Sequence, residues 1–181
     1  INRQIVSAVR TPIATAYKGT LRDTPAETPA THIVSESVRR SGLRADRFDD
    51  VILAESLYGG GDLARYAAVA SGMTTVSGQA VNRHCAGSLA AVGNAAASIR
   101  ADMDAAVIAG GAQSTTLSPT LSWKAIGSDW SVERLPPTFP HTAEATDDVS
   151  LIVGWSTALR YDVSREAMDG LLYTAPSPRD R

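Results

Sequence analysis

The sequence predicts an α/β fold with a mostly parallel sheet, because short apolar runs alternate along the chain with helical segments. The clearest run is Val51-Ile52-Leu53-Ala54, which is apolar throughout, as is typical of a strand buried on both faces of a parallel sheet. The chain has 181 residues, of which 44% are hydrophobic and 20% charged, a composition typical of one globular domain.

The other expected elements follow from periodicity, caps and breakers, and they come in the order strand 4–9, helix 30–41 closed by Gly42, strand 51–54, helix 63–71 capped by Asp62, strand 79–82, helix 85–100 and strand 105–109. Helix 85–100 is rich in Ala, Gly and Ser and apolar nearly all round, which predicts burial between layers. Gly59-Gly60-Gly61 and Gly110-Gly111 lack the rest of a phosphate or dinucleotide motif and are expected to form turns.

The second part of the chain has a different composition. Residues 113–146 are rich in Ser, Thr and Pro and predict a long loop, whereas Ser164 begins a capped helix that is expected to stop at Gly170. Residues 171–181 closely resemble a translated sequencing adapter, so we expect a non-native tail there. The chain opens at Ile1 without an initiator Met, so a clipped N-terminus is expected. The expected domains are 1–113, 114–170 as a partial loop domain, and 171–181.

Composition also narrows the function. The net charge of −2 argues against nucleic acid or anionic lipid as the main partner, the single cysteine excludes a disulfide scaffold, and no run of 18 apolar residues is present to span a bilayer. No signal peptide is visible, so a cytoplasmic location is expected. His32, His84 and His141 have no ligand spacing with Cys85, and no metal site is expected.

Cys85 is the candidate catalytic residue. It is expected to follow a strand and open a helix, where unpaired backbone amides and the helix dipole lower the pKa of a thiol and can receive a carbonyl oxygen. Gly87 would allow a close backbone approach. On spacing alone the alternative is a small core residue in an Ala-rich helix. His84 is expected to pack rather than to act as the base for Cys85.

Several motifs resemble the thiolase superfamily in its N-terminal half, and they occur in the family's order: Ala8-Val9-Arg10-Thr11-Pro12-Ile13, Asp49-Asp50-Val51-Ile52-Leu53, Ala64-Arg65-Tyr66-Ala67-Ala68, Val81-Asn82-Arg83-His84-Cys85-Ala86-Gly87-Ser88-Leu89 and Val107-Ile108-Ala109-Gly110-Gly111-Ala112-Gln113-Ser114. The resemblance implies a layered α/β/α fold with a mixed, mostly parallel sheet and part of an inserted loop domain. The chain departs from the family at residues 149–156, where many members carry a His-Met-Gly segment.

The resemblance also implies an activity, in which Cys85 takes an acyl group from acyl-CoA for Claisen condensation or for thiolytic cleavage of 3-ketoacyl-CoA, as in fatty acid metabolism. CoA thioesters would be substrates, with no permanently bound cofactor and unknown CoA-binding residues. Trp123 and Trp130 either line an acyl channel or pack the loop domain. The full-length protein would be a homodimer or homotetramer.

The family also needs a later His, an Asn and a second Cys, which this chain lacks, so the chain alone is expected to be inactive. Two alternatives stay open at this point. One is a ketoacyl-synthase-type condensing enzyme, and the other is a non-catalytic thiolase-like protein for lipid transfer or scaffolding.

Overall fold

The computed structural model describes residues 4–133 and 149–174. It divides the chain into two compact units, residues 1–120 and 121–181, which are described separately. The domain boundaries expected after residues 113 and 170 stay predictions.

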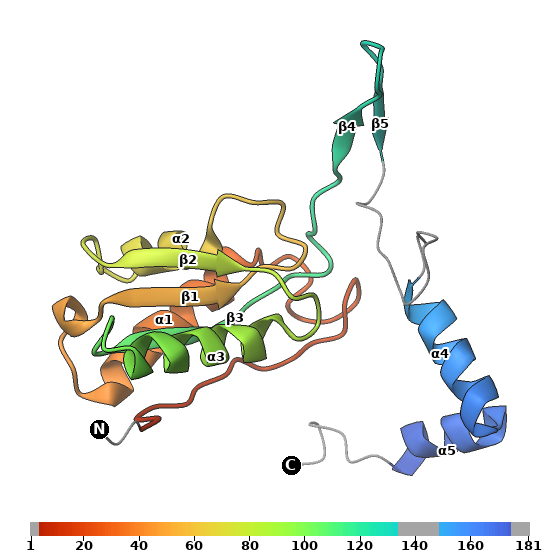
Figure 1. The fold of residues 1–181 in the computed structure, drawn as a ribbon, viewed down its shortest axis with the longest axis horizontal. Coiled ribbons are helices and arrows are strands. Elements are labelled where there is room, and N and C mark those ends of the chain that lie inside the picture. Colours follow the sequence, from red (N-terminus) through yellow and green to blue (C-terminus); the bar gives the residue numbers. More distant parts are fainter. Residues whose placement is uncertain (1–3, 134–148, 175–181) are drawn as a thin grey trace. The chain divides into compact units, whose positions relative to one another are not determined.

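The first unit is built on a parallel sheet of β1 (Asp50–Ala54), β2 (Ser77–Val81) and β3 (Val107–Gly111), in the order β2-β1-β3 (Figure 1). Ile52, in the middle of the central strand, lies opposite Gln79 of β2 and Ala109 of β3. All three strands therefore end at the same edge of the sheet.

Helices cover both faces of this sheet. α1 (Glu27–Ser41) and α2 (Leu63–Ala70) lie on one face and α3 (Gly87–Arg100) on the other, while a short 3-10 turn, η1 (Ala45–Arg47), leads into β1 (Figure 1). Alternate side chains of the central strand supply both cores, because Val51 and Leu53 pack with α1 and α2, and Ile52 packs with α3. The α/β/α layering and the parallel sheet are confirmed.

The predicted C-terminal end of α1 and the predicted N-terminal cap of α2 are confirmed, whereas α1 begins at Glu27, before the expected Ala30. Gly42 ends α1 with a left-handed φ of 72°, which glycine adopts without strain. Asp62 caps α2, where its carboxylate accepts a hydrogen bond from the backbone amide of Arg65 at 3.0 Å. Gly59 to Gly61 form the turn that precedes this cap, with φ between 93° and 103°.

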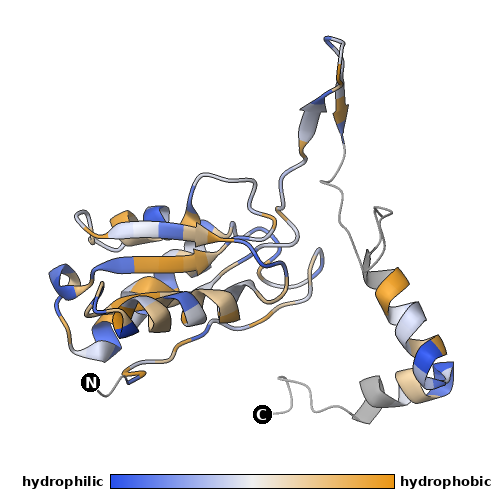
Figure 2. Cartoon of the chain, in the orientation of Figure 1, coloured by the Kyte–Doolittle hydropathy of each residue, from blue (hydrophilic) through white to orange (hydrophobic). Residues whose placement is uncertain are grey.

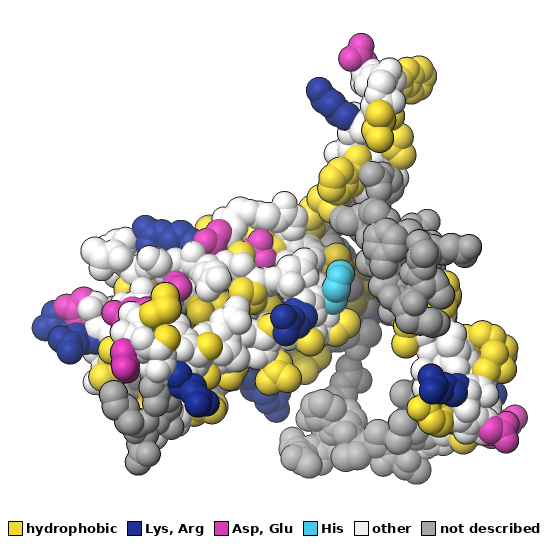
Figure 3. All heavy atoms as spheres, viewed as in Figure 1, with side chains coloured by type: hydrophobic (Ala, Val, Ile, Leu, Met, Phe, Trp, Pro, Cys, Tyr) yellow, Lys and Arg dark blue, Asp and Glu magenta, His cyan; other side chains and the backbone are white. Residues whose placement is uncertain are grey.

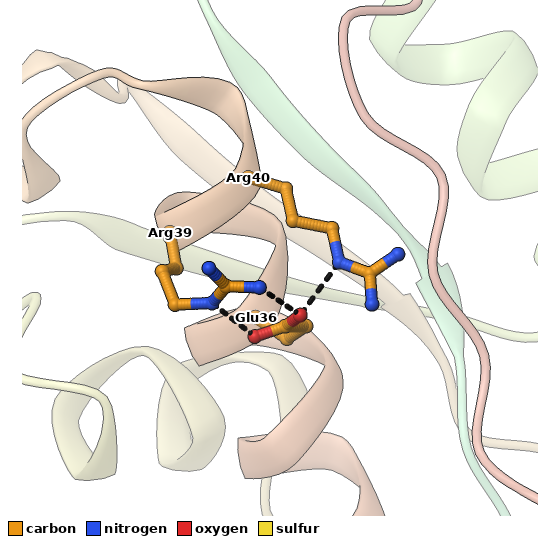
Figure 4. Close-up of polar contacts among 3 residues, drawn as sticks. All are labelled: Glu36, Arg39 and Arg40. Carbon is orange, nitrogen blue, oxygen red and sulfur yellow. Dashed lines mark hydrogen bonds and ion pairs between the residues drawn. The ribbon is translucent and has the colours of Figure 1, made fainter.

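One carboxylate on α1 is shared by two arginines. Glu36 accepts hydrogen bonds from Arg39 Nε at 2.7 Å and from Arg40 Nε at 2.6 Å (Figure 4). The spacings of three and four residues place these side chains on one helix face. The hydrogen bond from Arg39, which has the larger effect, and the hydrogen bond from Arg40 lower the pKa of Glu36 to about 2.

The strand expected at residues 4–9 is not formed. This segment lies outside the three-stranded sheet, and Ile5 and Val6 are exposed by 83% and 63%. An extended segment becomes a strand only when its backbone pairs with a neighbour, and the described strands provide no partner for it. Apolar character alone therefore does not predict a strand at this position.

The third strand begins later than expected and includes both of its glycines. The carboxylate of Asp49 accepts the backbone amides of Ala105 and Ala106 at 2.7 and 3.1 Å, which holds them in a turn and starts β3 at Val107. The same two hydrogen bonds lower the pKa of Asp49. Gly110 and Gly111 thus belong to a strand, and their prediction as a turn is wrong.

Within the described residues, helix α3 buries one face against the sheet, and burial of its other face stays a prediction for the full-length protein. Gly87, Ala91 and Ala95 are buried against the sheet, whereas Leu89 is 77% exposed. No element of the described residues in the first unit covers the outer face, so hydrophobic and polar side chains alternate there in the open (Figures 2 and 3). The small residues of α3 serve close packing on the sheet.

The second unit contains a hairpin and two helices. The hairpin pairs β4 (Ser122–Lys124) with β5 (Ser131–Glu133) in antiparallel register, within the region expected to be loop. The helices are α4 (Val149–Tyr161) and α5 (Arg165–Thr174). Trp123 and Trp130 lie on the hairpin, with their side chains 40% and 77% exposed.

Helix α5 corrects a second expectation. Its cap is confirmed, because Ser164 Oγ accepts the amide of Ala167 at 3.1 Å, but the helix continues through Gly170 to Thr174. A single glycine costs a helix about 1 kcal/mol and does not forbid it. The remainder of the expected tail, residues 175–181, lies outside the described residues, as does His141. None of the described helices is both long and apolar enough to cross a membrane.

Candidate active site

The candidate site lies at the carboxyl edge of the parallel sheet, where the segments after the three strands come together. Glu55 and Ser56 follow β1, Asn82 begins the turn after β2, and Gln113 follows β3. Ligands of open α/β sheets bind at this edge, since the loops that follow the strands meet there. The connection from β2 to α3 carries Cys85 across this edge (Figure 1).

Cys85 sits in a tight turn, with an exposed side chain, and α3 begins two residues later at Gly87. This corrects the expectation that Cys85 opens the helix. The amides of Ala86 and Gly87 donate to the carbonyls of Arg83 and His84, at 3.1 and 3.0 Å. These two amides are therefore engaged within the turn, and the first turn of α3 supplies the further amides that a helix leaves without intrahelical partners.

His84 adopts a left-handed conformation immediately before Cys85. Its φ is 47°, and its amide donates to Asn82 Oδ1 at 2.9 Å. Asn82 Nδ2 in turn donates to the carbonyl of Ser56 at 3.4 Å, a longer contact that reaches the segment after β1. His84 is exposed, so its expected packing role is wrong, because the left-handed turn keeps its side chain at the surface.

Glycines allow the start of α3 to lie directly on the ends of two strands. A Cβ added to Gly87 would meet the Cβ of Ala54, at the end of β1, at 2.7 Å. A Cβ added to Gly111, at the end of β3, would collide with Ser88 Oγ and with Ala54. Gly87 thus permits a close approach of helix to strand, and the close backbone approach expected beside the nucleophile stays a prediction.

Two contacts near this edge were not predicted from the sequence. Glu55 Oε2 accepts the amide of Leu63 at 2.7 Å, which fixes the start of α2 to the end of β1. The hydroxyl of Tyr58 donates to Glu27 Oε1 at 2.8 Å and ties the same loop to the start of α1. Burial of the phenol, as the larger cause, and its hydrogen bond to Glu27 raise the pKa of Tyr58 to about 12. Neither pair is close in sequence, so no local pattern reveals it.

Two cavities of the first unit lie beside this edge. The larger, about 590 Å³, is lined by residues 9–16, by residues 111–116 and by α1 residues that include His32. The smaller, about 270 Å³, is lined by Glu27, Tyr58 and Gln113, among others. Cys85 lines neither cavity, and it is presented instead at the surface of the turn.

Within the first unit, His32 and Cys85 do not line a common cavity. His32 lies in α1 beside the larger cavity, and the two tryptophans lie on the hairpin of the second unit. Across residues 4–133 and 149–174, no three or more His, Cys, Asp or Glu side chains are grouped to hold a metal ion. The described site thus consists of one thiol on a turn fixed by Asn82 and by glycine packing.

Comparison with known proteins gives relatives along almost the whole chain. A putative acetyl-CoA C-acetyltransferase, VraB, of Staphylococcus aureus strain MW2 is 29% identical over 178 residues, which cover 96% of this chain and 46% of the relative. The acetyl-CoA acetyltransferase of Escherichia coli strain K12 is 34% identical over 123 residues, 66% of this chain and 31% of the relative.

A solved structure of an acetyl-CoA acetyltransferase also resembles this chain. The crystal structure of the Bacillus anthracis acetyl-CoA acetyltransferase matches with a TM-score of 0.74 at 26% identity, and the match covers 92% of this chain and 44% of that one. The chain thus spans about half the length of these relatives. The model of the family described as "Thiolase, N-terminal domain" matches residues 4–171. The chain therefore belongs to the thiolase superfamily and corresponds to its N-terminal half.

Proposed function

We propose that this chain carries the acyl-accepting half of an acyl-CoA acyltransferase, with Cys85 as the nucleophile. The observation that carries the proposal is the position of Cys85: its thiol is exposed on a turn at the carboxyl edge of a parallel sheet, in a chain of the thiolase superfamily. The relatives' names support the class of donor, because they are acetyl-CoA acetyltransferases.

The proposed first step is a transthioesterification. The thiolate of Cys85 attacks the thioester carbonyl, the bond between that carbon and the sulfur of CoA breaks, and CoA leaves as a thiolate that takes up a proton. In the second step a second thioester loses an α-proton to a base, its carbanion attacks the acyl carbon to form a carbon–carbon bond, and the bond from that carbon to the sulfur of Cys85 breaks, which returns the thiolate. Cleavage of a 3-ketoacyl-CoA is the same sequence in reverse.

Residues around Cys85 have supporting roles in this proposal. Asn82 and Gly87 hold the two ends of the turn, and the start of α3 contributes the positive end of a helix dipole near the developing negative charge. CoA and acyl-CoA are substrates, and the active species is a homodimer or homotetramer of the full-length protein. The proton donor and acceptor for the second step come from outside the described turn.

The test is an intact-mass measurement on the protein in its full natural length after incubation with acetyl-CoA and with longer acyl-CoAs. We expect a mass increase of one acyl group in the wild type and none in Cys85→Ser, which keeps a polar group of similar size at the same exposed position. Absence of any adduct would favour a non-catalytic thiolase-like protein. A malonyl donor that is used only with loss of CO₂ would favour the ketoacyl-synthase-type reaction.

A further inference from the structure

The residue directly before the candidate nucleophile is held in an unusual backbone conformation. His84 has a φ of 47°, in the left-handed region that a residue with a Cβ enters at a cost. Such positions persist where neighbouring groups hold them, and they gather at functional sites. The dihedral angles of His84 decide the direction in which the backbone delivers Cys85.

One side chain supplies the restraint. Asn82 Oδ1 accepts the amide of His84 at 2.9 Å, which closes a side-chain turn two residues long. The other end of the same amide group, Nδ2, donates to the carbonyl of Ser56 at 3.4 Å. Asn82 thus connects the turn to the segment that follows the neighbouring strand β1, and neither a carboxylate nor an alkyl side chain can make both bonds.

The far end of the turn is fixed independently. Gly87 rests on Ala54 so closely that a Cβ would approach to 2.7 Å, and its amide donates to the carbonyl of His84 at 3.0 Å. Cys85 therefore lies between an end fixed by packing and an end fixed by the side chain of Asn82. Loss of Asn82 would release the second end only.

We propose that Asn82 is a positioning residue for acyl transfer: its side-chain amide holds His84 left-handed, and this presents the Cys85 thiol to the acyl donor in one fixed direction. The inference rests on the proposed role of Cys85 as acyl acceptor. It assigns to Asn82 no contact with substrate. A misplacement of the reacting atom by about 1 Å can lower a rate by about two orders of magnitude, which sets the scale of the effect.

The first experiment compares two reactions of the same thiol in the full-length protein. We expect Asn82→Ala to lower the rate of acyl transfer from acetyl-CoA to Cys85 at least about tenfold, because orientation governs that reaction. Alkylation of the exposed thiol by iodoacetamide should change less than about twofold, because a small reagent attacks from many directions. An unchanged acyl-transfer rate, or an equal loss in both reactions, would overturn the proposal.

The second experiment is a rescue. Glycine adopts a positive φ without support from a neighbour, so His84→Gly combined with Asn82→Ala should restore most of the lost acyl-transfer rate. Asn82→Asp, which keeps the acceptor for the His84 amide and loses the donor to Ser56, should retain more activity than Asn82→Ala. Failure of His84→Gly to restore any activity would show that the conformation of His84 is not what Asn82 controls.

A measurement that needs no activity separates this inference from the proposed function. The His84 amide should exchange its hydrogen with solvent faster in Asn82→Ala than in the wild type, since that variant removes its acceptor. If the wild type takes no acyl group, the proposed function fails, and faster exchange still supports the hold of Asn82 on the turn. If the His84 amide exchanges at the same rate in the wild type and in Asn82→Ala, Asn82 does not restrain the turn, and the inference is overturned whatever the acyl-transfer activity.

Discussion

Tyr58 donates a hydrogen bond of 2.8 Å to Glu27, and this single contact joins the loop after β1 to the first residue of α1. Both residues line the cavity of about 270 Å³ beside the sheet edge. The phenol is partly buried, and burial and the adjacent carboxylate both disfavour its ionised form. The pair therefore contributes to stability only while the tyrosine is protonated.

A first prediction follows for alkaline pH. The pKa of Tyr58 is raised from 10.0 to about 12, so its contribution to the unfolding free energy is complete below pH 10 and is lost as the pH rises from 10 to 12. Urea unfolding across this range should show the urea midpoint falling with pH. In Tyr58→Phe the stability at pH 8 should be lower by about 1–2 kcal/mol. The fall specific to pH 10 to 12 should also be reduced, and an unchanged fall would contradict the assignment.

A second prediction concerns acid pH and the triad on α1. Glu36 has its pKa lowered from 4.5 to about 2 by Arg39 and Arg40, so its stabilising effect is present above pH 4.5 and is lost as the pH falls toward 2. Both arginines are more than half exposed, at 69% and 53%, so the effect should be small and weakened by salt.

The contribution of Glu36 is measured by thermal unfolding of the wild type and of Glu36→Gln between pH 2 and pH 5, at low and at high salt. The difference between the two proteins should shrink as the pH falls and as salt is added. A difference that grows toward pH 2, or one that is insensitive to salt, would show that Glu36 stabilises α1 by other means.

A third prediction compares two glycines in the same helix. Gly87→Ala should destabilise the protein by roughly 1–3 kcal/mol, because the new methyl group would lie 2.7 Å from that of Ala54. Gly93→Ala lies in the middle of α3, where nothing beyond its chain neighbours and the helix's own backbone comes within 4 Å of the ideal Cβ, and it should stabilise by roughly 0.5–1 kcal/mol through helix propensity.

The two variants add the same methyl group to one helix, against Ala54 in one case and in open space in the other, so opposite signs in urea unfolding are the expected result. Gly87→Ala should also slow the reaction of Cys85 with acetyl-CoA, because the turn that carries Cys85 ends on this glycine. Destabilisation of equal size by both substitutions would mean that helix packing on Ala54 is looser than the structure indicates.

Sequence reasoning predicted elements with a strong local signal and failed where tertiary partners decide. The apolar run of β1 and the caps at Gly42 and Asp62 were identified, because each leaves a pattern within a few residues. The run at residues 4–9 has the same apolar character and forms no strand, since strand formation depends on a partner that a local pattern cannot reveal.

The candidate site shows the same division. Cys85 was identified from the motif around it, but its position two residues before α3 depends on the turn that Asn82 and His84 form. The role of Gly111 was missed because its reason is a contact with Ser88 and Ala54, from two other elements. A pattern within one segment does not reveal contacts between residues of different helices and strands.

The most direct test of the central claim is to locate and count the acyl group. The full-length protein is incubated with acetyl-CoA, released CoA is quantified, and the protein is digested at mildly acidic pH for fragmentation mass spectrometry. We predict one CoA released for each acetyl group found, with the acetyl on Cys85 as a thioester that hydroxylamine removes. An acetyl group on another residue, or CoA release that persists in Cys85→Ser, would contradict the account.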